Sequence, residues 1–212
     1  MSILRSIDEV ASTIDLTQRE LGRRVLVGIA GAPGAGKSTI AEALVATLGS
    51  RAALLPMDGF HLPQHRLVEL GRRDRMGAPD TFDVGGFLEV LRALAAGSIH
   101  NQNQDVTAPG FDRTIEEPVR GAITIAADTQ VVVVEGNYLL LEEFGWAGAL
   151  PQFDLTFFVD LDDDIRLQRL IDRHVRFGKS IADARDWALG PDERNAVIIT
   201  ATAVNADHII RL

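Results

Sequence analysis

The sequence has 212 residues, of which 46% are hydrophobic and 24% are charged, so it can bury one good core and is short for two independent domains. Its formal net charge of -9 repels nucleic acid and anionic membranes, and we expect neither as a partner. The absence of cysteine excludes disulfides and thiolate metal sites, so cytoplasm is the expected compartment.

The first 21 residues mix apolar and charged side chains at helical spacing, which predicts an amphipathic helix over residues 1–21 and not a signal peptide. No apolar run approaches the roughly 18 residues of a membrane helix, so we expect no membrane insertion. Apolar runs rich in β-branched residues then predict buried strands at residues 25–30, 52–57, 131–134 and 155–159. Helical patterns at residues 38–48, 84–96, 163–177 and 181–204 separate them.

This alternation of strands and helices predicts an α/β fold of three layers, with helices on both faces of a parallel sheet. The sheet should have about five strands, the last of them an edge strand within residues 207–212. A polar stretch at 101–105, a Pro109-Gly110 turn and a short apolar run at 122–126 predict a hairpin-like insertion at 97–130 that covers a substrate. We therefore expect one domain over 1–212, with this insertion and a helical lid at 163–180.

A phosphate-binding loop follows the first buried strand. The segment from Gly31 to Ser38 fits G-x-x-x-x-G-K-[ST] and lies between a strand and a helix, as the motif requires. Its glycines let backbone N–H groups surround phosphate oxygens, while Lys37 adds charge and the Ser38 hydroxyl can bind Mg²⁺. A P-loop NTPase-type fold that binds ATP and Mg²⁺ is thus expected, although a glycine-rich turn that binds nothing is the alternative. The nucleotide-binding residues would be Gly31, Ala32, Pro33, Gly34, Ala35, Gly36, Lys37, Ser38 and Thr39.

Two acidic residues follow predicted strands directly. Asp58 should lie at the carboxyl end of strand 52–57, where it could accept a hydroxyl proton or hold water on the metal. A turn-forming Asp before Gly59 explains that position equally well. Glu135 closes a run of four valines, which favours a second carboxylate near the metal.

Together with Met57-Asp58-Gly59-Phe60-His61 and Glu135-Gly136-Asn137-Tyr138, the phosphate loop resembles the uridine kinase, phosphoribulokinase and pantothenate kinase group of P-loop kinases. Segments 77–83, 110–113, 116–118 and 169–178 are most similar to bacterial proteins labelled nucleoside or nucleotide kinase family, or "putative fructose transport system kinase". The resemblance implies that Asp58 is the catalytic Asp and that Glu135 lies near Mg²⁺. It also implies an acceptor pocket surrounded by His61, Asp80, Phe82, Asp83, Asp112, Arg113 and Tyr138.

Four arginines recur at steps of three or four on the helix predicted at 163–177: Arg166, Arg169, Arg173 and Arg176. Arginines on a mobile helix can bring positive charge to a γ phosphate when a site closes, and Arg169 and Arg173 are the expected catalytic pair. We expect Arg166 on a solvated face, paired with nearby acidic residues. Trp187 is expected to pack in the core, and residues 71–75 form either an exposed loop or a basic patch facing an anionic acceptor.

These features predict transfer of the ATP γ phosphate to a hydroxyl of a small metabolite, such as fructose or another sugar, a nucleoside or a pantothenate-like compound. A regulatory GTPase would need an Asn-Lys-x-Asp motif, which the sequence lacks. A nucleotide-binding regulatory or transport-accessory ATPase remains an alternative. The resemblance further suggests a homodimer.

Overall fold

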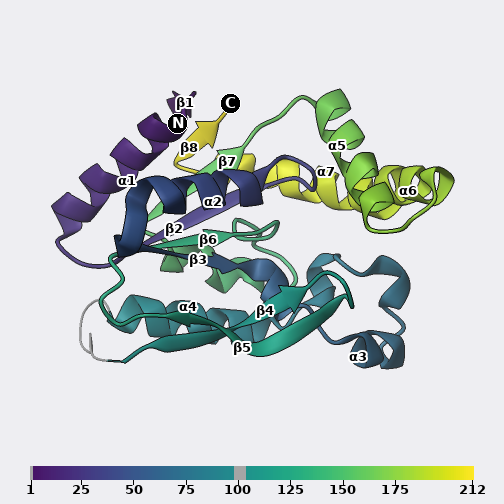
Figure 1. The fold of residues 1–212 in the computed structure, drawn as a ribbon, viewed down its shortest axis with the longest axis horizontal. Helices are drawn as coiled ribbons and strands as arrows, with labels where there is room; N and C mark the ends of the chain where they lie inside the picture. The colour runs from purple at the N-terminus through teal and green to yellow at the C-terminus, as the bar shows by residue number, and fades with distance from the viewer. Residues whose placement is uncertain (1, 98–103) are drawn as a thin grey trace.

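The computed structural model describes residues 2–97 and 104–212 (Figure 1). Residues 98–103, which belong to the predicted insertion, lie outside the described residues, as does residue 1. Within the described ranges a parallel six-stranded sheet has the order β1-β8-β7-β2-β6-β3. Its strands are β1 (Ser2–Leu4), β2 (Val25–Gly31), β3 (Ala52–Pro56), β6 (Val131–Glu135), β7 (Leu155–Val159) and β8 (His208–Ile210).

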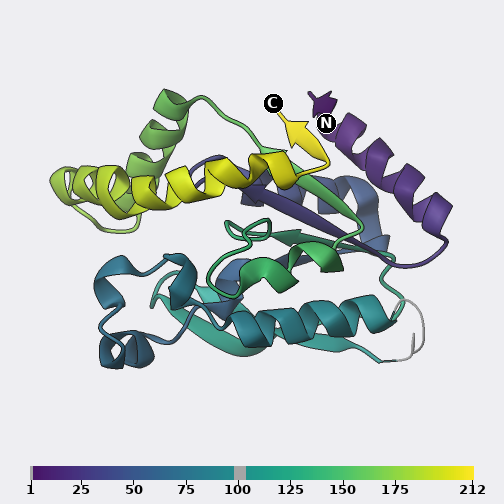
Figure 2. The same cartoon turned by 180° about the vertical axis from the view of Figure 1, so that it is seen from behind.

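Helices cover both faces of this sheet, which confirms the three-layer α/β fold. The helices are α1 (Ile7–Leu21), α2 (Lys37–Leu48), α3 (Gln64–Glu69), α4 (Val84–Gly97), α5 (Asp163–Arg176), α6 (Ile181–Trp187) and α7 (Glu193–Ala201). α1 and α2 pack on the face toward the viewer in Figure 1, and α4 and α7 cover the opposite face, seen in Figure 2. β2 and β6 are buried at every residue, because each contributes side chains to both cores.

The N-terminal prediction was partly wrong. Residues 2–4 are not helical but form β1, which pairs with β8, so the sheet has six strands and β8 is not at its edge. Ser6 separates this strand from α1, because its extended backbone stops the helix and its hydroxyl accepts a hydrogen bond from the Glu9 N–H group. A strand of three residues is too short to show a recognisable alternation of apolar and polar residues in the sequence.

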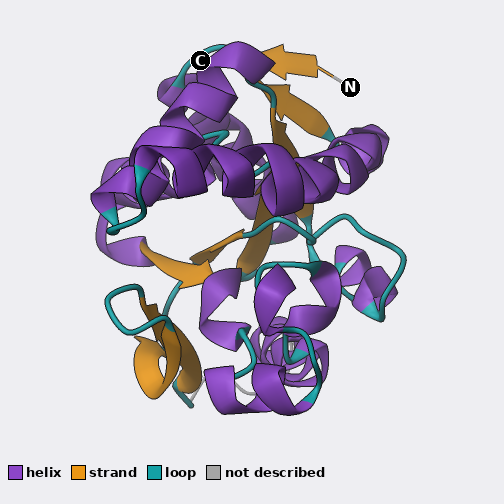
Figure 3. Ribbon diagram, turned by 90° about the vertical axis from the view of Figure 1, so that its right-hand side faces the viewer, coloured by secondary structure: helices purple, strands orange, loops and turns teal. Residues whose placement is uncertain are grey.

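The predicted insertion contains a two-stranded antiparallel hairpin of β4 (Val106–Asp112) and β5 (Glu117–Ile125). Figure 3 shows these strands to one side of the main sheet. Contrary to the prediction, Pro109 and Gly110 do not form the turn of the hairpin. They lie inside β4, where its register with β5 shifts. The turn that joins the strands is at residues 113–116.

The predicted helix over 181–204 is divided. α6 ends at Trp187, a π-helical turn follows over Ala188–Asp192, and α7 begins at Glu193. Pro191 lies in this turn and cannot donate a backbone hydrogen bond, which accounts for the break in the regular helix. In the part of the chain that the structure describes, no helix is long and apolar enough to cross a membrane.

Candidate active site

The predicted site residues converge because of strand register. Glu135, the last residue of β6, is paired with Ile29 of β2 on one side and with Pro56 of β3 on the other. The phosphate loop follows β2, and Asp58 follows β3 within a 3-10 turn over Met57–Phe60. The carboxyl ends of neighbouring parallel strands thus bring Lys37, Asp58 and Glu135 to one edge of the sheet.

The loop between β2 and α2 has the geometry of an anion site. Gly34 and Gly36 have φ values of 84° and 95°, which favour glycine, and Gly36 caps α2 without a side-chain hydrogen bond. The first N–H groups of α2 have no partner within the helix and are free for phosphate oxygens. The Lys37 Nζ atom donates to the Ala32 carbonyl oxygen at 3.1 Å, which holds the ammonium group inside the loop.

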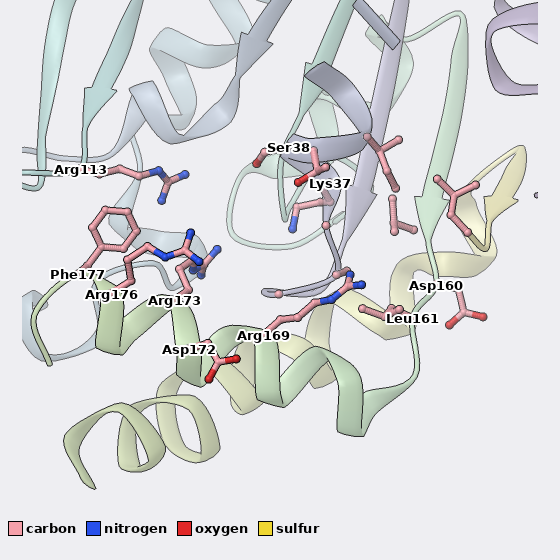
Figure 4. Close-up of a pocket in the computed structure, with 17 residues that line it drawn as sticks. Lys37, Ser38, Arg113, Asp160, Leu161, Arg169, Asp172, Arg173, Arg176 and Phe177 are labelled. Atoms are coloured by element: carbon pink, nitrogen blue, oxygen red, sulfur yellow. The ribbon is translucent and has the colours of Figure 1, made fainter. Parts of the chain in front are cut away.

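Two cavities meet at this loop. The first, called the large cleft here, has a volume of about 730 Å³ and is lined by loop residues 34–40, by residues 159–161 after β7, and by arginines of α5. Figure 4 shows the guanidinium groups of Arg113, Arg169 and Arg173 around the space next to Lys37. This cleft thus combines backbone donors with positive side chains on the opposite wall, as the phosphates of a nucleotide require.

The second cavity, called the small pocket, has a volume of about 220 Å³. Its walls come from the turn after β3, the hairpin, the segment after β6 and the helices α5 to α7. Asp58, His61, Phe82, Arg113 and Glu135 line it, so the structure brings together five of the residues predicted for catalysis, metal and acceptor. Pro33, Lys37 and Ser38 of the phosphate loop also line this pocket, and Gly34 to Thr39 line the large cleft, so Lys37 and Ser38 belong to both.

Asp58 lies between several cations. Its Oδ2 atom accepts a hydrogen bond from the Arg113 Nη2 atom at 2.7 Å. Burial alone would raise the pKa of the Asp58 carboxyl, but the positive charges of His61, Arg113 and Lys37 outweigh it and hold the pKa below its usual range. Asp58 is therefore ionised at neutral pH and can accept a hydrogen bond from a hydroxyl group, since Arg113 binds only one of its two oxygens.

Ser38 and Glu135 fit a Mg²⁺ ion. The Ser38 hydroxyl donates to Glu135 Oε1 at 3.1 Å, and burial, followed by the charge of Asp58, raises the pKa of the Glu135 carboxyl. Among the described residues no group of three or more His, Cys, Asp or Glu side chains could hold a metal alone. Mg²⁺ suits this arrangement, because it binds through one or two carboxylates together with phosphate oxygens and water.

His61 has a fixed orientation in the wall of the small pocket. Its Nδ1 atom lies 2.8 Å from the Asp58 carbonyl oxygen, and because a carbonyl only accepts, Nδ1 carries the hydrogen. Burial is the main cause that lowers the pKa of the His61 ring. The ring packs against Phe82 and Phe111, with centroid distances of 4.0 and 4.8 Å.

The remaining predicted acceptor residues do not line either cavity within the described residues. Asp80 binds Arg75, Asp83 accepts from the Gly86 N–H group at the start of α4, and Asp112 accepts from the Thr114 N–H group in the hairpin turn. Tyr138 is fully buried and its hydroxyl donates to the Gly77 carbonyl oxygen at 2.6 Å; burial raises its pKa. These side chains hold the loops around the small pocket.

The arginines of α5 line different cavities. Arg169 and Arg176 line the large cleft, and Arg173 lines both cavities. The expectation for Arg166 was wrong about exposure, since its side chain is 3% exposed, but the expected pairing with Asp163 is present at 2.9 Å, and Glu193 lies on the other side at 2.6 Å. Arg166 therefore ties α5 to α7.

Sequence reasoning missed part of the small pocket. Its lining includes Arg73, Lys179, Trp187, Asp192 and Asn195. Trp187 was expected in the core but is half-buried, with the Lys179 Nζ atom 4.5 Å from its ring centroid. Of residues 71–75, Arg73 lines the pocket while Arg72 and Arg75 bind Asp80, and a basic patch facing an anionic acceptor stays a prediction. In the sequence, only the polar character of these segments indicated that they could line a pocket.

The fold and the phosphate loop define a P-loop kinase. A model described as the Phosphoribulokinase / Uridine kinase family matches residues 26–211, and the chain belongs to that family. The Escherichia coli K12 protein YggC, described as uncharacterized, is 36% identical over 90% of this chain and 78% of its own. A "putative uridine kinase" of Schizosaccharomyces pombe is 31% identical over 83% of this chain and 76% of its own.

Solved structures agree with this assignment. The structure titled "putative fructose transport system kinase" from Silicibacter sp. TM1040 has a TM-score of 0.86 and 32% identity, covering 96% of this chain and 98% of that chain. YFH7 of Saccharomyces cerevisiae, titled a "putative P-loop containing kinase", shares the fold with a TM-score of 0.83 at 21% identity, over 98% of both chains.

Proposed function

We propose that the protein transfers the γ phosphate of ATP to a hydroxyl of a small metabolite, a sugar such as fructose, a nucleoside or a pantothenate-like compound. One observation carries this proposal: the large cleft and the small pocket share Lys37, Ser38, Arg113 and Arg173. A nucleotide in the cleft would place its terminal phosphate at this junction, facing an acceptor in the pocket. An enzyme that only hydrolyses ATP has no need for a second cavity of this chemistry.

The residues at the junction have separate roles in the transfer. The acceptor oxygen attacks the γ phosphorus, the bond from that phosphorus to the ADP oxygen breaks, and the hydroxyl proton passes to the Asp58 carboxylate. Lys37 and Arg173 stabilise charge on the phosphoryl oxygens, while Arg169 contributes from the large cleft. Ser38 and Glu135 would hold Mg²⁺, which neutralises phosphate charge when bound.

The test is an ADP-release screen with Mg·ATP and a panel of sugars, nucleosides, pantothenate-like compounds and polyols, with each phosphorylated product identified by mass. We expect one acceptor class to release ADP in step with its product. Lys37→Ala and Asp58→Asn should each reduce this turnover by roughly 10²-fold or more. Slow ADP release that no acceptor stimulates, without a phosphorylated product, would overturn the proposal in favour of an accessory ATPase.

A further inference from the structure

The charges in the wall of the small pocket do not balance. Four carboxylates line it: Asp58 binds Arg113, Glu116 binds Arg73, Asp192 lies 2.7 Å from His174, and Glu135 accepts from the neutral Ser38 hydroxyl. Among the described residues, three cations of this wall have no carboxylate within ion-pair distance, namely Lys37, Arg173 and Lys179. Five lysine and arginine side chains stand against four carboxylates in this wall, so its net charge is positive.

Two of these cations already have a role at the transferred phosphate. Lys37 and Arg173 line both cavities, at the junction where the terminal phosphate would lie. Lys179 lines the small pocket and not the large cleft. Its positive charge is thus available to the acceptor and not to the nucleotide.

Lys179 is held in place without being neutralised. It lies in the loop between α5 and α6, is half-buried, and has its Nζ atom 4.5 Å from the centroid of the Trp187 ring. An aromatic face attracts an ammonium group and orients it, yet leaves its hydrogen-bond donors free for a ligand. Lysine is also rare here: of 21 basic residues only Lys37 and Lys179 are lysines, and both line the small pocket.

Arg73 gives the pocket wall another oriented donor. The Arg73 Nε atom donates to Gln64 Oε1 at 3.0 Å and its Nη2 atom to Glu116 Oε2 at 2.8 Å, while Nη1 has no partner among the described residues. The pocket has a volume of about 220 Å³, against about 730 Å³ for the large cleft, which suits a compact acceptor. A small anion would satisfy the unmatched charge within this space.

We infer that the acceptor is a small hydroxylated anion whose carboxylate or phosphate group is bound by Lys179 on the face of Trp187. The inference rests on the proposed function and names its substrate class. Asp58 faces the reacting hydroxyl, and Lys179 binds the charged group of the same molecule. A neutral acceptor would leave the Lys179 ammonium half-buried and without a counter-charge. The enzyme therefore binds a neutral acceptor with lower affinity than an anionic one.

The first experiment compares acceptors in matched sets that share one hydroxylated skeleton. Glycerol, glycerate and glycerol 3-phosphate form one set, and fructose, 2-ketogluconate and fructose 6-phosphate another, with further sets built on other sugars and on nucleosides. We expect an anionic member to have the highest kcat/KM in the set that is used, and the carboxylate and phosphate members separate the two sources of charge. If neutral members are phosphorylated best, the inference fails while the kinase proposal stands. If no member is phosphorylated, both fail.

The second experiment uses matched variants of Lys179. Lys179→Met keeps the length of the side chain and removes its charge, so KM for the anionic acceptor should rise by about 10- to 100-fold while KM for ATP is unchanged. Lys179→Arg keeps the charge and should retain most of the affinity. Equal effects of both variants, or equal increases in both KM values, would indicate a structural role and overturn the inference.

A third readout does not depend on turnover. Because the chain has two lysines, mass spectrometry after brief amine acylation resolves each of them. The preferred anionic acceptor should protect Lys179 from acylation, whereas ATP alone should protect Lys37, and the neutral member of the same set should protect neither. Labelling of Lys179 that the anion leaves unchanged would contradict the inference.

Discussion

Lys37 is a buried cation whose charge depends on pH. Its side chain lies inside the phosphate loop, and desolvation lowers its pKa to about 8, although the nearby Glu135 charge opposes this shift. The protonated form predominates below this pH and is the form that attracts phosphate oxygens. The free enzyme therefore loses this charge as the pH rises through about 8, within a range in which ATP itself keeps its charge.

We predict that kcat/KM for ATP decreases as the pH rises through about 8, because this parameter reports ionisations of the free enzyme. A pH profile at saturating acceptor measures it. Lys37→Arg provides the control, since a guanidinium stays charged over this range; its activity should be lower and the decrease near pH 8 absent. A decrease of the same size in the variant would assign the ionisation to another group.

Site residues differed in how far the sequence could reveal them. Asp58 and Glu135 were predictable because each comes at the end of an apolar run, and strand ends of a parallel sheet share one edge. Lys179 and Trp187 come from a loop and a short helix whose position depends on the π-helical turn and on Arg166. Neither periodicity nor a motif encodes that position. The same limit applies to Arg73, whose neighbours Arg72 and Arg75 point elsewhere.

At the level of elements, the phosphate loop and α5 touch through Gly34. A Cβ atom at Gly34 would lie 2.7 Å from the Arg166 carbonyl oxygen, and its φ of 84° is unfavourable for other residues. Gly34→Ala should therefore lower the free energy of unfolding by about 1–3 kcal/mol and raise KM for ATP. Denaturant unfolding and steady-state kinetics measure the two effects.

Gly85→Ala is the matched control for this substitution. Gly85 lies in α4, its added Cβ would meet nothing closer than 3.7 Å, and its φ is not positive. Alanine there should leave KM for ATP unchanged and preserve or increase stability, since alanine favours helices. If both variants behave alike, the contact between the phosphate loop and α5 contributes neither to stability nor to ATP binding.

The hairpin approaches the turn that carries Asp58 in a similar way. A Cβ atom at Gly59 would lie 2.0 Å from the Pro109 carbonyl oxygen of β4, so any larger residue must displace the hairpin. Because Arg113 follows β4 and Asp58 adjoins Gly59, Gly59→Ala should reduce kcat with acceptor more than it changes ATP affinity. Kinetics together with ATP binding by calorimetry separate the two. Loss of ATP binding to the same degree would mean that the whole edge of the sheet had moved.

For the whole molecule, alternation of strand and helix was enough to predict the three layers, because buried parallel strands have continuous apolar runs. The missing parts are those with weak local signals. β1 has only three residues; the division between α6 and α7, by contrast, had a local signal in Pro191 that the prediction of one continuous helix did not use. The hairpin was found, but its turn was misplaced because Pro109-Gly110 marks an irregularity within a strand.

The shared wall of the two cavities predicts coupling between the two ligands. A non-hydrolysable ATP analogue with Mg²⁺ should increase acceptor affinity by about 5- to 150-fold in calorimetry, because it orders Arg173 and draws Arg113 from Asp58. Arg173→Met should reduce this factor. Arg176→Met, which alters a residue of the large cleft alone, should weaken the analogue but leave the factor unchanged. Independent binding in the unaltered protein would contradict the shared site.

The ion pair between Arg113 and Asp58 also affects how readily ATP is hydrolysed when no acceptor is bound. Water fills the small pocket whenever no acceptor is present, and it is a potential nucleophile at far higher concentration than any metabolite. While the guanidinium binds the Oδ2 atom, its charge lowers the pKa of the Asp58 carboxyl and makes this carboxylate a weaker base towards water. The resting enzyme is thereby disposed to conserve its ATP until a molecule arrives that can separate the pair.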